Sequence, residues 1–350
     1  MKRPLVSIII VNWNGLHFLK PCLKTLSNCT YKNKEIIVVD NGSCDGSVKW
    51  LQENYHRVRI CSLSRNVGFA QGNNEGYCIA KGEFIVFLNN DTKVHPDFID
   101  EMIAKWQSDK TIGGVQSKLL LMDAPSKLDS VGAFFTRSGF LYHWGFGKKD
   151  SPVYDKTTKL FTAKGACMGF PRHVLEKILV NGVIFDPSYF SYFEETDLCH
   201  RIWLTGKTIQ YAPKSIVYHT MGGTSTSMNN AYIQFHSYKN RIHSYLKNFE
   251  WKNLWFLPLH IFTCIVIAFV LLLQGKPSYS RAILGAITWN AVHFSDTWKK
   301  RLFIQKHIRR IPDSSYMPFV LVSPKLDYYM YLFQGTVGYK EKEWIEYSQV

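Results

Sequence analysis

Four apolar runs rich in β-branched residues constrain the fold more than any other feature of the chain. They span residues 5–11, 35–39, 58–63 and 84–88, and each runs directly into Asn, Asp, Ser or Gly. Segments of helical length begin after them near Gly15, Asp45, Phe69 and Pro96. Strand, polar turn and helix, repeated in this order, predict a parallel α/β sheet. Because the runs do not alternate with polar residues, we expect both faces of that sheet to be covered.

Polar residues gather where the predicted strands end, which is where ligands bind in sheets of this kind. Asp40 can accept a hydrogen bond from a base or a ribose. Asn66, Gly68 and Asn73 allow backbone and amide groups to approach a phosphate or a sugar closely. Asp91 is placed to meet a divalent cation that bridges phosphate oxygens. Each residue alone is an ordinary turn or cap residue, but four such turns together favour a nucleotide site.

Composition and absent motifs exclude several classes of protein. Hydrophobic residues make up 46% and charged residues 20% of the chain, which excludes a disordered chain, collagen and a pure coiled coil. No GxGxxG follows the first run and no GxxxxGK[ST] occurs, so a dinucleotide fold and a P-loop NTPase are disfavoured. The eight cysteines lack metal-type spacing and indicate reduced thiols in a cytosolic compartment. The first run is short for a signal peptide, which favours a buried strand.

The chain is strongly basic, with 42 Lys plus Arg against 27 Asp plus Glu and a formal net charge of +15. This balance indicates an anionic partner such as a phosphate, a nucleic acid or an acidic membrane. A nucleic-acid interface needs a basic stripe interleaved with aromatic residues on one element. Only residues 299–310 approach that pattern, and they lie near an apolar segment. We therefore expect an anionic membrane surface and no nucleic acid among the partners.

A cluster of three carboxylates follows an aromatic run in the second half of the chain: Glu194, Glu195 and Asp197. On a helix, Glu194 and Asp197 share a face, whereas Glu195 points about 100° away. Carboxylates this close repel one another and raise the pKa of one of them, which suits a general base. The alternative is a helix N-terminus whose acids complement the helix dipole. We favour catalysis.

Taken in order, the segments SIIIVNWNG, VVDNGSCDGS, RNVGFAQGNNEG and FLNNDT resemble glycosyltransferase family 2, which has the GT-A fold. YFEETDLCHR (192–201) and YHTMGGTST (218–226) fall where that family has its acidic and His-Gly motifs. The resemblance covers roughly residues 4–245 and is nearest to the bacterial rhamnosyltransferase-like branch. It implies a Rossmann-like, mostly parallel α/β sheet with flanking helices.

The resemblance also implies a donor site and a cation site. Asp40 would read the nucleobase, and Asn89-Asn90-Asp91 occupies the place of the DxD metal motif. Because its first position is Asn89, Asp91 would be the only acidic ligand from this turn for Mg²⁺ or Mn²⁺, and binding would depend on the donor. His219 would contact the metal or the diphosphate; the alternative is a strand-end histidine bonded to backbone. The implied donor-binding residues are Asn12, Asn14, Asp40, Asn66, Gly68, Asn73 and Asn90.

The family's catalytic base falls on Glu195, with Glu194 and Asp197 as alternates because Glu is longer than the Asp of the motif. The implied enzyme is an inverting hexosyltransferase. It would move a sugar from dTDP-rhamnose or a UDP-sugar to a lipid-linked or cell-surface polysaccharide acceptor. The alternative enzyme is a nucleotidyltransferase acting on a sugar phosphate. That enzyme needs a basic loop after the first strand, where this chain has NWNGLHF.

The chain is expected to have three regions: a nucleotide-sugar half (1–110), an acceptor and catalytic half (111–245), and a helical, membrane-associating region (246–350). In the middle region, Tyr142, Trp144 and Phe146 can stack on a sugar or pack in the core, and we favour the core. Lys164 and Gly165 are predicted to line the site.

Residues 254–273 carry no charged side chain, and as a helix they would be about 30 Å long, enough to span a bilayer. Pro258 and His260 interrupt the first third. A single span would also translocate residues 298–310, which hold six Lys or Arg and no acid, against the positive-inside rule. We predict an interfacial or re-entrant attachment at the cytoplasmic face of the plasma membrane, with residues 298–310 on anionic headgroups. A single span and a helix hairpin packed on the catalytic domain are the alternatives.

Overall fold

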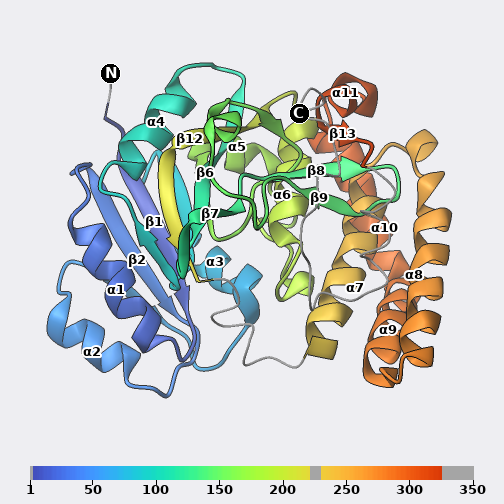
Figure 1. The fold of residues 1–350 in the computed structure, drawn as a ribbon, viewed down its shortest axis with the longest axis horizontal. Coiled ribbons are helices and arrows are strands. Elements are labelled where there is room, and N and C mark those ends of the chain that lie inside the picture. The colour runs from blue at the N-terminus through green and yellow to red at the C-terminus, as the bar shows by residue number, and fades with distance from the viewer. Residues whose placement is uncertain (1–2, 221–229, 325–350) are drawn as a thin grey trace.

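The computed structural model describes residues 3–220 and 230–324, and a ten-stranded sheet with helices on both faces forms its centre (Figure 1). The strand order is β10-β12-β6-β11-β4-β1-β2-β3, and β5 and β7 pair with β12 and β6. Residues 221–226 of the His-Gly segment lie outside the described residues.

The first half of the chain has the predicted parallel α/β arrangement. The four parallel strands are β1 (Val6–Asn12), β2 (Lys34–Asp40), β3 (Arg59–Ser62) and β4 (Phe84–Leu88). The helices that follow them are α1 (Leu16–Ser27), α2 (Ser47–Asn54), α3 (Gly68–Ile79) and α4 (Phe98–Gln107). All four predicted strands and all four predicted helix starts are confirmed.

The sheet is buried on both faces, as its continuous apolar strands predict. Ile8 and Ile10 of β1 join the core cluster that contains Leu23 of α1, whereas Ile9 joins the cluster that contains Ala70 of α3. Alternate residues of a strand point to opposite faces, so a strand between two helical layers needs apolar residues at nearly every position.

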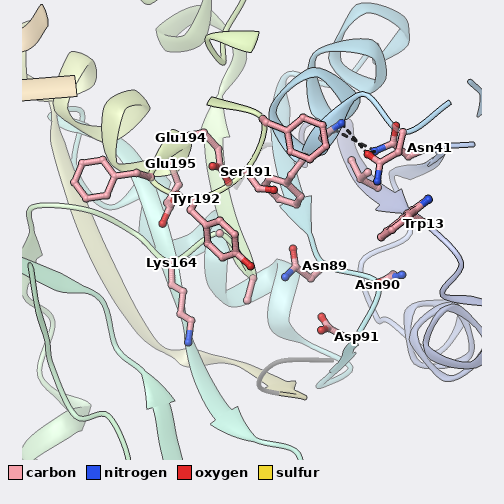
Figure 2. Close-up of a pocket in the computed structure, with 18 of the residues that line it drawn as sticks. Trp13, Asn41, Asn89, Asn90, Asp91, Lys164, Ser191, Tyr192, Glu194 and Glu195 are labelled. Carbon is pink, nitrogen blue, oxygen red and sulfur yellow. Dashed lines mark hydrogen bonds between the residues drawn. The ribbon is translucent and has the colours of Figure 1, made fainter. Parts of the chain in front are cut away.

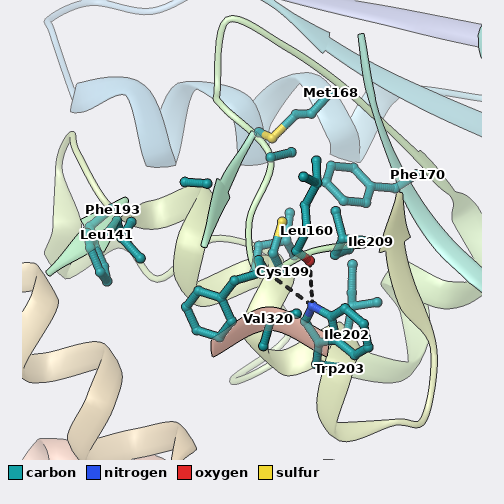
Figure 3. Close-up of a cluster of buried hydrophobic side chains, with 14 of the residues drawn as sticks. Leu141, Leu160, Met168, Phe170, Phe193, Cys199, Ile202, Trp203, Ile209 and Val320 are labelled. Atoms are coloured by element: carbon teal, nitrogen blue, oxygen red, sulfur yellow. Dashed lines mark hydrogen bonds between the residues drawn. The ribbon is translucent and has the colours of Figure 1, made fainter. Parts of the chain in front are cut away.

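The second half of the chain extends the same sheet. Its strands are β5 (Thr92–Val94), β6 (Ile112–Leu121), β7 (Ala124–Ser130), β10 (Lys159–Leu160), β11 (Cys167–Pro171) and β12 (Thr208–His219). Because β11 pairs with both β4 and β6, the boundary predicted at residue 110 is not a break in the sheet. Helix α6 (Glu194–Leu204) carries Ile202 and Trp203 into a cluster with Phe170, and the Trp203 indole donates to the Leu160 carbonyl at 3.0 Å (Figure 3).

A small sheet of β8 (Ala133–Thr136), β9 (Leu141–His143) and β13 (Leu321–Val322) lies beside the large one. Tyr142 and Trp144 are buried there, and Trp144 packs against Phe134 and Tyr154, so the predicted core role is confirmed for both; Phe146 is half-buried. The remaining short elements are α5 (Arg172–Leu175), α11 (Met317–Val320), the π-helical turn Ile304–Ile308, and the single turns Pro152–Asp155, Glu176–Ile178, Pro187–Tyr189, Trp251–Asn253 and Asp313–Ser315.

Four helices form the C-terminal layer on the right of Figure 1: α7 (Asn230–Asn248), α8 (Phe256–Leu273), α9 (Pro277–Val292) and α10 (Phe294–Phe303). Helix α7 packs against α9, α10 and the catalytic-half helix α6, so the helical layer begins well before the predicted boundary at residue 245. Helix α8 is continuous through Pro258, contrary to the predicted interruption. His260 is buried, and its Nδ1 lies 2.8 Å from the Ser138 carbonyl oxygen.

The basic segment 298–310 is only partly available to a membrane, which corrects the prediction. Lys300 pairs with Asp186 at 3.0 Å. Arg301 donates to backbone carbonyls at the end of α7, and Arg309 pairs with Asp313 at 2.8 Å. These three cations therefore contact acceptors of the protein itself. The outward-facing cations of the segment are Lys299, Lys306 and Arg310.

Candidate active site

A cavity of about 370 Å³ opens at the carboxyl ends of β1, β2 and β4 and reaches the start of α6 (Figure 2). This is where a parallel sheet binds ligands. The predicted residues that line it are Asn66, Gly68, Asn90, Asp91, Lys164, Gly165, Glu194, Glu195 and His219. Figure 2 shows Trp13 and Asn41 on one side of the cavity and the Glu194–Glu195 pair on the other.

The first side of the cavity is held by amide contacts between two loops. The Asn41 amide donates to Asn66 Oδ1 at 2.9 Å, and Asn41 Oδ1 accepts from the Val67 N–H at 2.9 Å. Gly68 adopts φ +89°, and a Cβ there would lie 2.5 Å from the Phe190 carbonyl oxygen. Only glycine therefore lets this loop approach the turn that precedes the acidic residues.

Four predicted donor-binding residues lie outside the cavity lining. Asn12 is fully buried and donates to Ser47 Oγ at 3.0 Å while accepting from the Asn90 amide at 2.8 Å. The Asp40 carboxylate accepts a hydrogen bond from the Ser43 N–H, and Asn14 Oδ1 accepts one from the Cys44 N–H. The Asn73 amide donates to the Phe69 carbonyl within α3. These side chains hold the loops in place; a direct contact of any of them with the donor stays a prediction.

A strained turn precedes the acidic residues on the other side of the cavity. Phe190, Tyr192 and Phe193 have φ values of 63°, 68° and 72°, a region that costs non-glycine residues about 1–3 kcal/mol each. Asn240 of α7 holds this turn, because its amide donates to the carbonyls of Tyr189, Ser191 and Tyr192. The C-terminal layer thus fixes the backbone that presents the carboxylates.

The two glutamates at the start of α6 differ in their environments. Glu194 is buried, and burial together with the neighbouring Glu195 carboxylate raises the pKa of Glu194 well above its ordinary value. Burial also raises the pKa of Glu195, to about 7, while backbone N–H groups and Lys164 oppose the rise. Burial and the neighbouring carboxylate thus favour the protonated form of Glu194, and Glu195 is poised to accept a proton near neutral pH.

Asp197, the other alternate base, is a structural carboxylate. Its side chain is 1% exposed, pairs with Arg201 at 3.0 Å and Lys247 at 3.2 Å, and accepts from the Tyr189 hydroxyl at 3.0 Å. Burial opposes ionisation, but the two cations outweigh it and hold the pKa of Asp197 well below its usual range. A carboxylate so paired and outside the cavity lining does not suit proton transfer.

Asp91 and His219 meet at the floor of the cavity, with His219 Nε2 lying 3.4 Å from Asp91 Oδ1. Asp91 Oδ1 and Asn89 Oδ1 are buried oxygens without a hydrogen-bond partner. Carboxylate, amide and imidazole groups are ligands for Mg²⁺ or Mn²⁺, so these residues fit a divalent cation. Within residues 3–220 and 230–324 no group of three or more His, Cys, Asp or Glu side chains could hold a metal, so a cation here needs further oxygens from a ligand.

Asp129, at the end of β7, is a residue that the sequence does not point to. It is fully buried, and it pairs with Lys164 at 2.6 Å and with His219 Nδ1 at 2.8 Å. Burial opposes its ionisation, but Lys164 and His219 outweigh burial and hold the pKa of Asp129 well below its usual range. Burial likewise opposes protonation of His219, but its hydrogen bond to Asp129 and the nearby Asp91 carboxylate raise the pKa of His219.

Trp13 and Asn41 also line the cavity, and both immediately follow a strand that ends in Asn12 or Asp40. Their position directly after predicted strands is the sequence feature that could have identified them as cavity residues. Asp129 carries no such signal, because only the tertiary fold brings it to Lys164 and His219.

The fold and the cavity define a mixed α/β protein with a candidate ligand site at the carboxyl ends of its parallel strands. Residues 7–179 match the sequence model of Glycosyl transferase family 2, and this part of the chain is a glycosyltransferase family 2 domain. Among curated relatives, the putative glycosyltransferase EpsH of Bacillus subtilis (strain 168) is 34% identical over 107 residues, which are 29% of this chain and 30% of that protein. The match thus spans less than a third of that relative's length.

Two solved structures resemble the whole fold. Mannosyltransferase PcManGT from Pyrobaculum calidifontis, in complex with GDP-Man and Mn²⁺, aligns with a TM-score of 0.52 at 15% identity, over 83% of this chain and 88% of that one. GalNAc-T7 with UDP, GalNAc and Mn²⁺ aligns with a TM-score of 0.66 at 14% identity, over 91% and 57% of the two chains. At these identities the likeness shows the GT-A-like mixed α/β fold alone.

Proposed function

We propose that the protein is an inverting glycosyltransferase that uses a nucleotide-diphosphate sugar and Glu195 as its general base. One observation carries the proposal: a glutamate whose pKa is about 7 faces, across a single cavity, the Asp91–His219 pair at the strand ends. A base poised near neutral pH and a diphosphate-cation site are the two elements that sugar transfer requires.

The chemistry follows from this arrangement. Glu195 accepts the proton of an acceptor hydroxyl, and the hydroxyl oxygen forms its bond to the anomeric carbon from the side opposite the diphosphate. The bond to the diphosphate breaks, and the nucleotide leaves with that electron pair, so the anomeric configuration inverts. Because burial favours the protonated form of Glu194, Glu195 is the carboxylate of the pair that ionises first.

Asp91 and His219 would hold Mg²⁺ or Mn²⁺, and the cation would neutralise charge on the leaving diphosphate. The buried, unpartnered oxygens of Asp91 and Asn89 support this assignment. The Mn²⁺ complexes of the two structural neighbours are consistent with it. Trp13 offers a flat surface for a base, and Asn41 and Asn66 frame the same side of the cavity.

For the donor we propose dTDP-rhamnose or a UDP-sugar, and for the acceptor a lipid-linked or cell-surface saccharide, as the resemblance to the rhamnosyltransferase-like branch implies. A thermal-shift screen of dTDP-, UDP- and GDP-sugars with Mn²⁺ tests the donor. We expect one nucleotide to raise Tm with Mn²⁺ and to lose most of that shift with EDTA, since the cation site needs donor oxygens. Stabilisation by no nucleotide, or a shift that EDTA leaves unchanged, would contradict the proposal.

We further propose that helix α8 attaches the enzyme to the cytoplasmic face of an anionic membrane while lying along its surface. In the described part of the chain, α8 is the one helix long and apolar enough to cross a bilayer. Its inner face packs in the protein through residues such as Cys264 and Ile267. Its outer face exposes Leu259, Phe262, Ile265, Phe269, Leu272 and Leu273. An apolar stripe on an otherwise packed helix suits insertion into the headgroup region.

Replacing two outer residues by acids tests this attachment. Phe262 and Phe269 are 63% and 59% exposed, so Phe262→Glu with Phe269→Glu leaves the packed face intact. We expect the double variant to lose at least tenfold in binding to vesicles of phosphatidylglycerol and phosphatidylcholine in a flotation assay, since burial of each Phe contributes about 1.5–3 kcal/mol. The matched control replaces both residues by Leu and is expected to float like the wild type. Undiminished flotation of the Glu variant would rule out α8 as the attachment.

A further inference from the structure

Asp129 is the fully buried centre of a short chain of polar groups beneath the proposed cation site. One carboxylate oxygen accepts from Lys164 Nζ at 2.6 Å, and the other accepts from His219 Nδ1–H at 2.8 Å. The His219 side chain is 7% exposed, so the ring has little freedom apart from this contact. The three residues come from β7, the loop before β11, and the end of β12.

This contact determines which nitrogen of His219 faces the cavity. With the proton held on Nδ1 by Asp129, the lone pair of neutral His219 lies on Nε2, which is 3.4 Å from Asp91 Oδ1. A histidine ligand of a metal is generally oriented by a carboxylate or carbonyl that accepts from its other nitrogen. The register of β12 adds to this, because His219 pairs with Thr92 next to Asp91.

We propose that Asp129 is the positioning residue of the cation site, fixing the tautomer and orientation of His219 so that Nε2 coordinates the cation together with Asp91. The inference rests on the proposed function, which supplies the cation site. Asp129 itself does not touch the cation or the sugar.

Lys164 makes the role of Asp129 testable, because an ammonium group can only donate hydrogen bonds. In an Asp129→Asn variant the single amide oxygen is expected to accept from Lys164. The amide NH₂ then turns to His219 Nδ1 and forces the His219 proton onto Nε2, facing Asp91. Adding Lys164→Met frees the amide oxygen to accept from His219 again.

The experiment measures the dissociation constant of Mn²⁺ for the full chain from the EPR signal of free Mn²⁺. The nucleotide that stabilises the protein in the thermal-shift screen is present at one fixed concentration, and a protein-free sample is the reference. We expect Asp129→Asn to weaken binding by about 10–100-fold. Lys164→Met alone is expected to leave the affinity equal or slightly tighter, since it removes a nearby positive charge. In the Asp129→Asn background, Lys164→Met is expected to recover most of the loss, so its effect is much larger there than in the wild type.

The outcomes separate this inference from the proposed cation site. If Asp91→Ala abolishes Mn²⁺ binding but Asp129→Asn leaves it unchanged, the positioning role is wrong and the cation site stands. An equal effect of Lys164→Met in both backgrounds would mean that Asp129 acts through its charge alone, which also overturns the role. If Asp91→Ala leaves binding unchanged, the cation site itself fails. The double variant removes both members of the buried pair, which protects folding where Asp129→Asn alone does not.

Discussion

Replacing Glu195 by Gln is expected to lower kcat by about 10²–10⁴-fold, the contribution of a positioned general base. The amide keeps the size of the side chain but cannot accept the hydroxyl proton. The variant is expected to fold, and at pH 8 to be no less stable than the wild type. Glu195 has a pKa of about 7, above its ordinary value, so the folded state loses stability as pH rises through that value, and Gln does not ionise.

The matched control is the same substitution one residue earlier. Glu194 is buried, and its raised pKa favours the protonated form, so Glu194→Gln keeps a neutral side chain of the same shape at this position. We expect it to lose far less activity than Glu195→Gln, and to keep the pH profile. A loss of activity in Glu194→Gln equal to that in Glu195→Gln would show that the base is misassigned.

The pH profile of wild-type kcat/KM gives an independent measurement. A base must be ionised to act, so log(kcat/KM) is expected to rise with pH below about 7 and to level off above it. The rise is expected to disappear from the residual activity of Glu195→Gln. A flat wild-type profile between pH 5 and 8 would contradict the assignment of Glu195.

The sequence predicts the first half of the fold well because local chemistry decides it there. Continuous apolar runs such as residues 84–88 can only be strands covered on both faces, and the turn residues after them define the edge where the cavity lies. Asp91 was predicted from its place at the end of a strand, whereas His219 and the choice of Glu195 came from the resemblance to glycosyltransferase family 2. The structure brings the three residues to one cavity, and their roles stay predictions.

The remaining features depend on contacts between distant segments. Asp129 meets Lys164 and His219 across 35 and 90 residues, a distance at which no pattern in one sequence carries information. The composition of the basic segment 298–310 predicts a charged surface. In the structure, however, Lys300 pairs with the buried Asp186 and Arg301 donates to the Phe249 carbonyl. The charge composition shows that the basic side chains need anionic or carbonyl partners. Only the fold shows which of these cations already pair with the protein's own carboxylates and carbonyls.

Asp197→Asn is expected to cause the largest loss of stability, about 3–5 kcal/mol, because it leaves the buried Arg201 without its carboxylate and leaves the buried Lys247 with Asp186 alone. Arg201 and Lys247 lie 3.0 and 3.2 Å from Asp197, and all three side chains are 1% exposed. Since the pKa of Asp197 is lowered, its contribution is complete above the ordinary pKa and is lost as pH falls below it. Denaturant unfolding at pH 7 measures the change. Its control is Glu53→Gln, which breaks an exposed pair with Lys49 and is expected to cost less than about 1 kcal/mol.

The same variant separates a structural carboxylate from a catalytic one. Lys247 comes from α7 and Arg201 from α6, so Asp197 links helix α6 to the C-terminal layer. Adding Arg201→Met to Asp197→Asn removes the cation that has lost its carboxylate and is expected to recover part of the stability. Activity should fall only as far as the folded fraction falls. Wild-type stability combined with lost activity in Asp197→Asn would instead place Asp197 in the chemistry and remove the argument that Glu195 alone is the base.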